Sequence, residues 1–270
     1  MFKSPGAVAI QFGPLTLHWY GLIIALAVLA GTMLASREAK QRGEDAEALL
    51  NVLVFSVLAA LVGARLYYVI FNWSFYWQSP ARIFAIWEGG LAIHGGIAGG
   101  FILGFIMMRT KRLPIATYLD IVAPSMILGQ ALGRWGNFFN QEAFGVPTDL
   151  PWKLYIDVAY RPAEYAQFSY FHPTFLYESV WDFLVFATLF GVLQKRLAPY
   201  SGALFLIYLA LYSVGRFFIE GLRTDSLMLG SFRVAQLVSV ALIVLAAVAV
   251  PLIIKKKYKV GQSGGGRNLL

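Results

Sequence analysis

The chain has 270 residues, of which 59% are hydrophobic and 13% are charged, a share of charge about half that of a typical soluble domain. Its formal net charge is +8, and it contains no cysteine, which excludes disulfides, thiolate metal sites and a cysteine nucleophile of its own. These values predict an all-α integral membrane protein and exclude a soluble globular domain.

Seven apolar segments follow one another along the chain, each close to the roughly 20 residues that a membrane-spanning helix needs. We expect these helices at residues 15–35, 48–71, 91–108, 114–135, 175–193, 202–219 and 234–254. The first segment is too long for a signal peptide. The rest of the pattern predicts an outer loop at 137–172 and a flexible basic tail at 255–270, within a single membrane domain over residues 1–270.

The basic residues are distributed unequally between the two sides of this arrangement. Thirteen follow the first, third, fifth and seventh segments, and six lie on the other side. Because Lys and Arg are enriched in cytoplasmic loops, the bias predicts an amino terminus outside and a carboxyl terminus in the cytoplasm. The positive charge is therefore a topology signal and does not indicate a nucleic-acid partner.

Polar residues inside the predicted helices lie near their outer ends. Three of them are arginines, Arg65, Arg134 and Arg216. An ionised side chain at this depth is costly, so it normally faces a protein interior or a wet cavity. We therefore expect a functional site at the depth of the outer leaflet.

The stretch GRWGNFFNQEAFG at 133–145 concentrates this polarity. Arg134 and Asn137 are three residues apart and Gln141 follows four later, so a continuing helix would align all three. The alternative is a polar helix cap that leads into the outer loop. Arginine suits a phosphate group because its planar fork donates paired hydrogen bonds and stays charged. With Arg216 at the same depth, the pattern indicates a site for an anionic phospholipid.

Two further stretches carry acidic residues at helical spacing. In YSVGRFFIEGLR, Tyr212, Arg216 and Glu220 share one helix face, which predicts an Arg216–Glu220 ion pair. In HPTFLYE, Glu178 lies about one turn into a helix, with Asp182 four residues later. A role in the site and a role in interior polar packing both remain open for that pair.

The stretch WEGGLAIHGGIAGG at 87–100 opens the third helix. Its glycines are spaced four apart, which favours close helix packing. His94 is a candidate base or hydrogen-bond partner, and a structural role is the alternative. The chain's three histidines are too scattered for a metal cluster, and no G-x-S-x-G motif is present, so we expect no metal site and a nucleophile that arrives with a substrate.

Together these motifs resemble the prolipoprotein diacylglyceryl transferase family: HWYG at 18–21, GGLAIHGG at 89–96, GRWGNFFNQEAFG, HPTFLYE at 172–178 and YSVGR…E…R at 212–223. The resemblance implies a multi-pass enzyme of the bacterial inner membrane that needs no cofactor. Such an enzyme transfers the sn-1,2-diacylglyceryl group from phosphatidylglycerol to the lipobox cysteine of a preprolipoprotein signal peptide. The products are a thioether-linked lipid and glycerol 1-phosphate.

The resemblance also assigns site residues. It implies essential roles for Arg134 and Arg216 at the phosphate. For the transfer step we expect His94 as the candidate base and Tyr212 as polar support, and an arginine-rich field that favours the thiolate without a dedicated base is the alternative. The residues expected to bind phosphatidylglycerol are Tyr20, Arg134, Asn137, Asn140, Glu142, Gly145, Arg216, Glu220 and Arg223.

Two other classes use buried charges in a membrane. One is a secondary transporter or lipid flippase with an anionic-lipid site, and the other is a lipid-binding scaffold without chemistry. Transporters tend to have internal repeats and polar groups near the membrane midplane. The one-sided polarity of this sequence favours the transferase.

Overall fold

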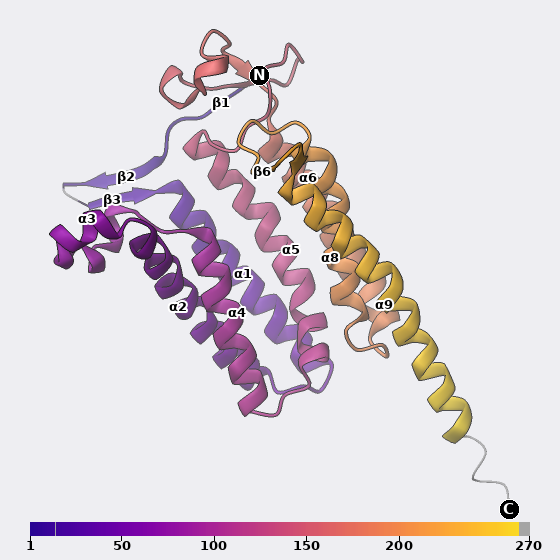
Figure 1. Cartoon of the computed structure of the whole chain (residues 1–270). Coiled ribbons are helices and arrows are strands. Elements are labelled where there is room, and N and C mark those ends of the chain that lie inside the picture. The colour runs from indigo at the N-terminus through magenta and orange to yellow at the C-terminus, as the bar shows by residue number, and fades with distance from the viewer. Residues whose placement is uncertain (14, 265–270) are drawn as a thin grey trace, which may run out of the picture. The chain divides into compact units, whose positions relative to one another are not determined.

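The computed structural model describes residues 1–13 and 15–264 of the chain and forms two compact units. Unit 1 comprises Met1–Ala35 and Leu119–Leu270, and unit 2 comprises Ser36–Tyr118. Both units are mainly helical (Figure 1). A single membrane domain over residues 1–270 stays a prediction.

The α-helices account for most of the described chain. They are α1 Trp19–Gln41, α2 Ala46–Phe71, α3 Trp73–Gln78, α4 Ile93–Thr110, α5 Ile115–Asn140, α6 Thr174–Thr188, α7 Gln194–Leu197, α8 Ala203–Glu220 and α9 Val234–Gly264. Short 3-10 turns are η1 Pro80–Phe84, η2 Ile86–Glu88, η3 Val158–Tyr160 and η4 Ala163–Tyr165, and the π-helical turn η5 Leu189–Leu193 joins α6 to α7. Within the described residues, seven helical stretches are long and apolar enough to span a membrane, which confirms the predicted multi-span class.

Several predicted boundaries differ from the structure. Helix α1 ends at Gln41, six residues beyond the predicted end at 35. Residues 15–18 form a strand because they pair with an earlier strand in a hairpin. Helix α5 continues five residues beyond the predicted end at 135, since backbone hydrogen bonds continue after the apolar run stops. Helix α9 extends to Gly264, so residues 255–264 are helical where a flexible tail was predicted; the rest of that tail, 265–270, lies outside the described residues.

The transmembrane part of unit 1 is organised around α8, which packs against α6 and α9 (Figure 1). Its fully buried core combines residues from α5, α6, η5 and α8: Ala123, Ile127, Val185, Leu189, Leu204 and Tyr208. The apolar faces of these helices therefore meet one another, which holds α5, α6 and α8 in fixed register for the polar residues near their other ends.

Helix α8 is capped by a side chain from another helix. Its N-cap residue Gly202 has a left-handed φ of 90° and offers no capping side chain of its own. Instead, the Asp120 carboxylate on α5 accepts hydrogen bonds from the backbone N–H groups of Gly202 at 2.7 Å and Phe205 at 2.8 Å. Asp120 is only 1% exposed, so this carboxylate satisfies donors that would otherwise be unpaired at a helix start.

The loop between α5 and α6 is a folded structure. Strand β4 (Leu154–Tyr155) pairs in parallel with β1 (Phe2–Lys3) and antiparallel with β5 (Tyr170–Phe171). A second apolar core includes residues of β4 and β5 and consists of Phe144, Leu154, Ile156, Phe171 and Phe175. The other strands form two hairpins, β2 Val8–Phe12 with β3 Leu15–His18 and β6 Met228–Leu229 with β7 Phe232–Arg233.

Unit 2 consists mainly of α2 packed closely against α4. A Cβ atom added at Gly95 would collide with the backbone carbonyl of Gly63, and one at Gly99 would collide with that of Ala59. The packing role predicted for these glycines is confirmed, because only hydrogen at these positions lets the two backbones approach this closely.

We predict that Asp120→Ala destabilises unit 1, because two partly buried N–H donors at the start of α8 lose their acceptor, and loss of a helix cap costs about 0.5–2 kcal/mol. Thermal unfolding of the purified protein in detergent, followed by loss of helical circular dichroism, should show a lower midpoint. Asp120→Asn keeps one acceptor oxygen, so its unfolding midpoint should lie between those of Asp120→Ala and the parent. Asp149→Ala, at a side chain with a relative exposure of 104%, is the control and should leave the midpoint unchanged. Equal midpoints for Asp120→Ala and the parent would contradict the capping role.

Candidate active site

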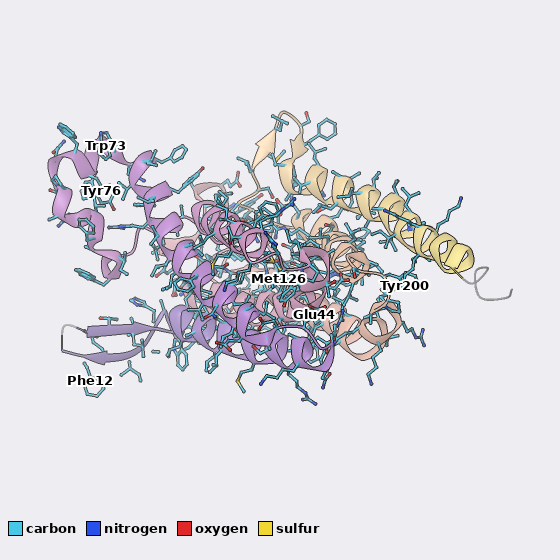
Figure 2. The ribbon with its side chains drawn as sticks, turned by 90° about the horizontal axis from the view of Figure 1, so that it is seen from below. Phe12, Glu44, Trp73, Tyr76, Met126 and Tyr200 are labelled. Carbon is cyan, nitrogen blue, oxygen red and sulfur yellow. The ribbon has the colours of Figure 1, made fainter. Side chains whose placement is uncertain are left out.

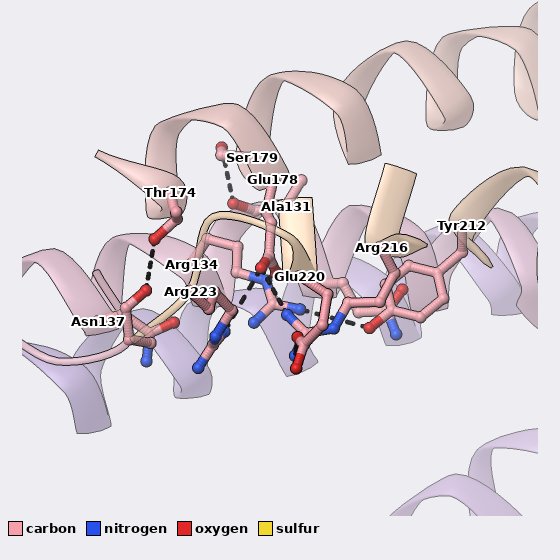
Figure 3. A network of polar contacts seen from close by, with 12 residues as sticks. Ala131, Arg134, Asn137, Thr174, Glu178, Ser179, Tyr212, Arg216, Glu220 and Arg223 are labelled. Carbon is pink, nitrogen blue, oxygen red and sulfur yellow. Dashed lines mark hydrogen bonds and ion pairs between the residues drawn. The ribbon is translucent and has the colours of Figure 1, made fainter. Parts of the chain in front are cut away.

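Three arginines of unit 1 converge on one buried carboxylate, that of Glu178 (Figure 3). Arg134 Nε lies 2.6 Å from Glu178 Oε2. Arg216 Nη1 lies 2.6 Å from Oε1, and Arg223 Nη1 lies 3.4 Å from the same oxygen. The Glu178 side chain is 4% exposed, so a single desolvated carboxylate is the common counter-ion of three guanidinium groups.

These four side chains come from separate elements that the core of unit 1 holds together. Arg134 is on α5, Glu178 on α6 and Arg216 on α8, and Arg223 follows the end of α8. Helix α6 begins at Thr174, directly after Pro173, a residue suited to a helix start. Glu178 therefore lies about one turn into α6, near the helix end that carries the cluster. The cluster therefore depends on the mutual packing of three helices.

Two further carboxylates complete the charge balance. Glu220 Oε2 lies 2.5 Å from Arg216 Nη2, which confirms the predicted pair. Asp225 accepts two hydrogen bonds from Arg223, at 2.9 Å from Nε and 2.7 Å from Nη2. Burial acts to raise the pKa of Asp225, but the hydrogen bonds and charge of Arg223 outweigh it and lower that pKa below its ordinary value. Asp225 therefore stays ionised beside Arg223 at neutral pH.

Tyr212 belongs to the same cluster. Arg134 Nη2 donates to the Tyr212 hydroxyl at 3.4 Å, and Tyr212 lies one helical turn before Arg216 on α8. Of the residues expected from the sequence, the structure thus brings together Arg134, Tyr212, Arg216, Glu220 and Arg223.

A second polar group lies where α5 ends. The Glu142 carboxylate accepts hydrogen bonds from the side-chain amides of Asn137 at 2.8 Å and Asn140 at 3.4 Å. The predicted alignment of Gln141 with Arg134 is wrong, because the helix stops at Asn140 and Gln141 has a positive φ of 54°. The Gln141 side chain instead binds Asp157 through two hydrogen bonds, at 2.6 and 2.8 Å, and so anchors the α5–α6 loop.

Two glycines permit close contacts around these groups. A Cβ atom at Gly136 would collide with the ring of Tyr20, so that ring lies directly against the α5 backbone. A Cβ at Gly145 would lie 2.7 Å from the Cβ of His172 and 3.0 Å from the carbonyl oxygen of Leu222. Gly145 also forms an isolated β-bridge with Arg223. A larger residue at 145 would therefore displace the backbone that carries Arg223.

His94 lies in unit 2, near the start of α4, with its ring centroid 6.1 Å from that of Tyr67. The cluster described above consists of residues of unit 1 alone. The assignment of His94 as the base stays a prediction.

Sequence reasoning did not assign Glu178 and Asp182 to the site. Asp182 lies one turn beyond Glu178 on α6 and is 2% exposed. The available signal was two carboxylates four residues apart inside an apolar segment, where an ionised group is costly without partners. That signal could not distinguish interior packing from a site, since the partners lie on α5 and α8.

The cluster is suited to an anion. The Arg134 and Arg216 side chains are 20% and 17% exposed, whereas the Glu178 carboxylate behind them is almost fully buried. Guanidinium groups that are fixed by ion pairs on one side and partly exposed on the other can donate to a phosphate without reorganising.

We predict that Glu178→Gln strongly destabilises the protein, because removing one partner of a buried ion pair typically costs about 3–5 kcal/mol. Thermal unfolding in detergent measures the effect. The matched control is Asp225→Asn, which breaks an ion pair whose carboxylate is 50% exposed, and an exposed pair contributes about 1 kcal/mol or less. If both variants unfolded at the same temperature, Glu178 would not be the common counter-ion.

Comparison with known proteins gives one consistent family. The family model described as prolipoprotein diacylglyceryl transferase matches residues 7–252. A protein of Trichormus variabilis named phosphatidylglycerol–prolipoprotein diacylglyceryl transferase is 55% identical over 243 residues, covering 88% of this chain and 86% of the relative. Relatives with the same name from Synechococcus elongatus (53% identical; 90% and 85% covered) and Gloeobacter violaceus (50% identical; 92% of both covered) agree. The match includes every element that contributes to the arginine cluster, and the chain belongs to the prolipoprotein diacylglyceryl transferase family.

Proposed function

We propose that this protein transfers the sn-1,2-diacylglyceryl group of phosphatidylglycerol to the lipobox cysteine thiol of preprolipoproteins, forming a thioether and releasing glycerol 1-phosphate. The names of the relatives supply the two substrates. The observation that carries the chemistry is the arrangement of Arg134, Arg216 and Arg223 around Glu178. It presents fixed guanidinium donors from the ends of membrane-spanning helices, where a phospholipid headgroup would lie.

Arg134 and Arg216 hold the phosphate in this proposal. The transfer breaks the bond between glycerol C3 and the phosphate oxygen, and the electron pair of that bond leaves with the phosphate. Negative charge therefore grows on the phosphate in the transition state. Guanidinium groups already fixed by Glu178 and Glu220 stabilise that charge without a reorganisation cost.

The nucleophile is the thiolate of the substrate, which fits a chain without cysteine. Its sulfur attacks glycerol C3, and the C–S bond forms as the C–O bond breaks. A free thiol has a pKa of about 8.5, so a base must take the proton or a positive field must favour the thiolate. His94 is the candidate base, and the arginine cluster is the alternative source of thiolate stabilisation.

The second polar group is suited to the glycerol headgroup. Asn137 and Asn140 carry amides that both donate and accept, and Glu142 accepts, so together they can pair with hydroxyl groups. Tyr20 packs on Gly136 beside them and contributes a phenol hydroxyl to the same task. Gly145 acts indirectly, because its close backbone contacts position the segment that carries Arg223.

The site faces the outer leaflet of the bacterial inner membrane in this proposal. The support is the excess of basic residues after the first, third, fifth and seventh spans, which favours a periplasmic amino terminus and a cytoplasmic carboxyl terminus. This orientation puts the α5–α6 loop and the arginine cluster where a signal peptide emerges from the membrane.

We predict that the purified protein, reconstituted with phosphatidylglycerol and a lipobox peptide, adds the mass of one diacylglyceryl group to the peptide cysteine. Arg134→Ala should lower turnover by about 10²- to 10³-fold, the usual effect of removing one transition-state donor. Arg134→Lys keeps the charge but lacks the planar guanidinium, so it should retain only part of the parent turnover. Arg196→Ala, at an exposed position on α7, is the matched control and should keep full turnover.

A peptide of unchanged mass with the parent protein would contradict the transferase. Movement of labelled lipid between leaflets in the same vesicles would then support the flippase alternative.

We predict that His94→Gln lowers turnover and removes the limb of the pH–rate profile that belongs to a histidine base. The mass assay at a series of pH values measures both quantities. A variant with normal turnover and an unchanged profile would exclude His94 as the base and leave the arginine field as the source of the thiolate. His172→Gln tests whether the effect is specific to His94.

A further inference from the structure

Arg65, the third arginine inside a predicted helix, has a different environment from the arginines of the site. It lies on α2 in unit 2 and is 6% exposed. Its guanidinium has five N–H groups, and all five donate to backbone carbonyls: Ile83 (2.9 Å), Gly89 (2.6 Å), Gly90 (3.0 Å), Arg82 (2.5 Å) and Ala85 (3.2 Å). This arginine therefore organises a segment of its own unit and has no donor left for a ligand.

The segment around Arg65 is shaped to receive it. Gly89 and Gly90 have positive φ values of 86° and 73°, which turn their carbonyl groups toward the guanidinium. A Cβ atom at Gly90 would lie 2.5 Å from Arg65 Nη1. The ring of Tyr76 covers the cation, with its centroid 5.2 Å from Arg65 Cζ. The charge is thus enclosed by one short stretch of chain between α2 and α4.

The outer side of this stretch is strongly apolar. Residues 73–87, which we call the aromatic platform, expose Trp73 (51%), Phe75 (50%), Trp77 (72%), Phe84 (78%), Ile86 (40%) and Trp87 (79%). Two of the residues that contact Arg65 are buried, since Tyr76 is 5% exposed and Ala85 is 6% exposed. Figure 2 shows Trp73 pointing away from the ribbon of α3 and Tyr76 on its inner side. The platform therefore has two different sides. Its inner side binds Arg65 through backbone carbonyls, and its outer side exposes aromatic rings.

We propose that the aromatic platform lies in the membrane interface, with its exposed rings among the headgroups and upper acyl chains of one leaflet and Arg65 as the residue that positions it. The platform directly joins two membrane-spanning helices, since α2 ends at Phe71 and α4 begins at Ile93. The last turn of α2 exposes Ile70 (65%) and Phe71 (71%), so an apolar surface continues from the spanning helix into the platform.

Lipid suits this surface better than a protein partner does. Indole rings concentrate at the boundary of the hydrocarbon region because they combine an apolar body with one N–H donor. Residues 72–90 contain only two charged residues, Arg82 and Glu88, so the platform lacks the polar rim of a typical protein interface. The Arg82 guanidinium lies 5.5 Å from the ring centroid of Phe75, so one of the two charges packs against the aromatic surface.

The absence of cysteine allows a direct test with single spin labels. Trp77→Cys and Trp87→Cys are each labelled in the full-length protein in bilayer nanodiscs, and relaxation by oxygen and by a water-soluble nickel chelate is compared. Val62→Cys, on α2 with 57% exposure, marks the hydrocarbon, and Glu164→Cys, at an exposed position of η4, marks water.

Both platform labels should give an oxygen-to-nickel ratio between those of the two reference sites. A ratio equal to that of Glu164→Cys would contradict the proposal, because the platform would then lie in water. Protection from both reagents would also contradict it, since a second copy or another protein would then cover the rings.

The positioning role of Arg65 is tested in the same labelled proteins. Arg65→Gln should increase the mobility of labels at 77 and 87 and move their ratio away from the interfacial value, because the amide of Gln has two N–H donors and at least three of the five carbonyls lose theirs. The label at Val62 should keep its ratio, which shows that α2 still spans the membrane. Unchanged spectra at 77 and 87 would contradict the role of Arg65, and a changed ratio at Val62 would assign it to helix insertion instead.

Discussion

The ion pairs of the Glu178 carboxylate are the interaction on which the rest of unit 1 depends. Three guanidinium groups, from α5, α8 and the turn after α8, share this one buried acid of α6. Buried charges are tolerated only when they are paired with good geometry, so the helices that carry them must keep their relative positions. The same pairing holds the guanidinium groups ready for an anion. Stability and the proposed phosphate binding therefore rest on the same contacts.

The two kinds of buried arginine in this protein show why the residue type alone does not identify an anion site. Arg65 gives all five of its N–H groups to carbonyl oxygens of a single loop. Arg134 and Arg216 pair with carboxylates and keep 20% and 17% of their side chains exposed. Backbone carbonyls accept the N–H donors of Arg65 and add no charge. Carboxylates neutralise Arg134 and Arg216 and hold them in place, while part of each side chain stays exposed. The first arrangement organises a surface, and the second can bind a ligand.

Glycine makes both arrangements possible, for two different physical reasons. Gly89 and Gly90 supply the positive φ values that aim carbonyls at Arg65. Gly145 and Gly136 supply space instead, since a Cβ atom would collide with His172 at one and with Tyr20 at the other. These glycines lie in the motifs GGLAIHGG and GRWGNFFNQEAFG, and each acts by positioning a neighbouring polar residue.

The sequence by itself determined the number and order of the seven spans, the family and most members of the arginine cluster. These properties follow from local apolar runs and from motifs that are contiguous in the chain, such as GRWGNFFNQEAFG. Only the tertiary structure decided that Glu178 joins Arg134, Arg216 and Arg223. All three partners are 38 to 45 residues away in the sequence, and none of them is on α6. It also decided that Gln141 leaves the helix to bind Asp157 and that residues 15–18 form a strand. A pattern along one helix cannot predict these contacts, since each depends on a partner that a different part of the chain supplies.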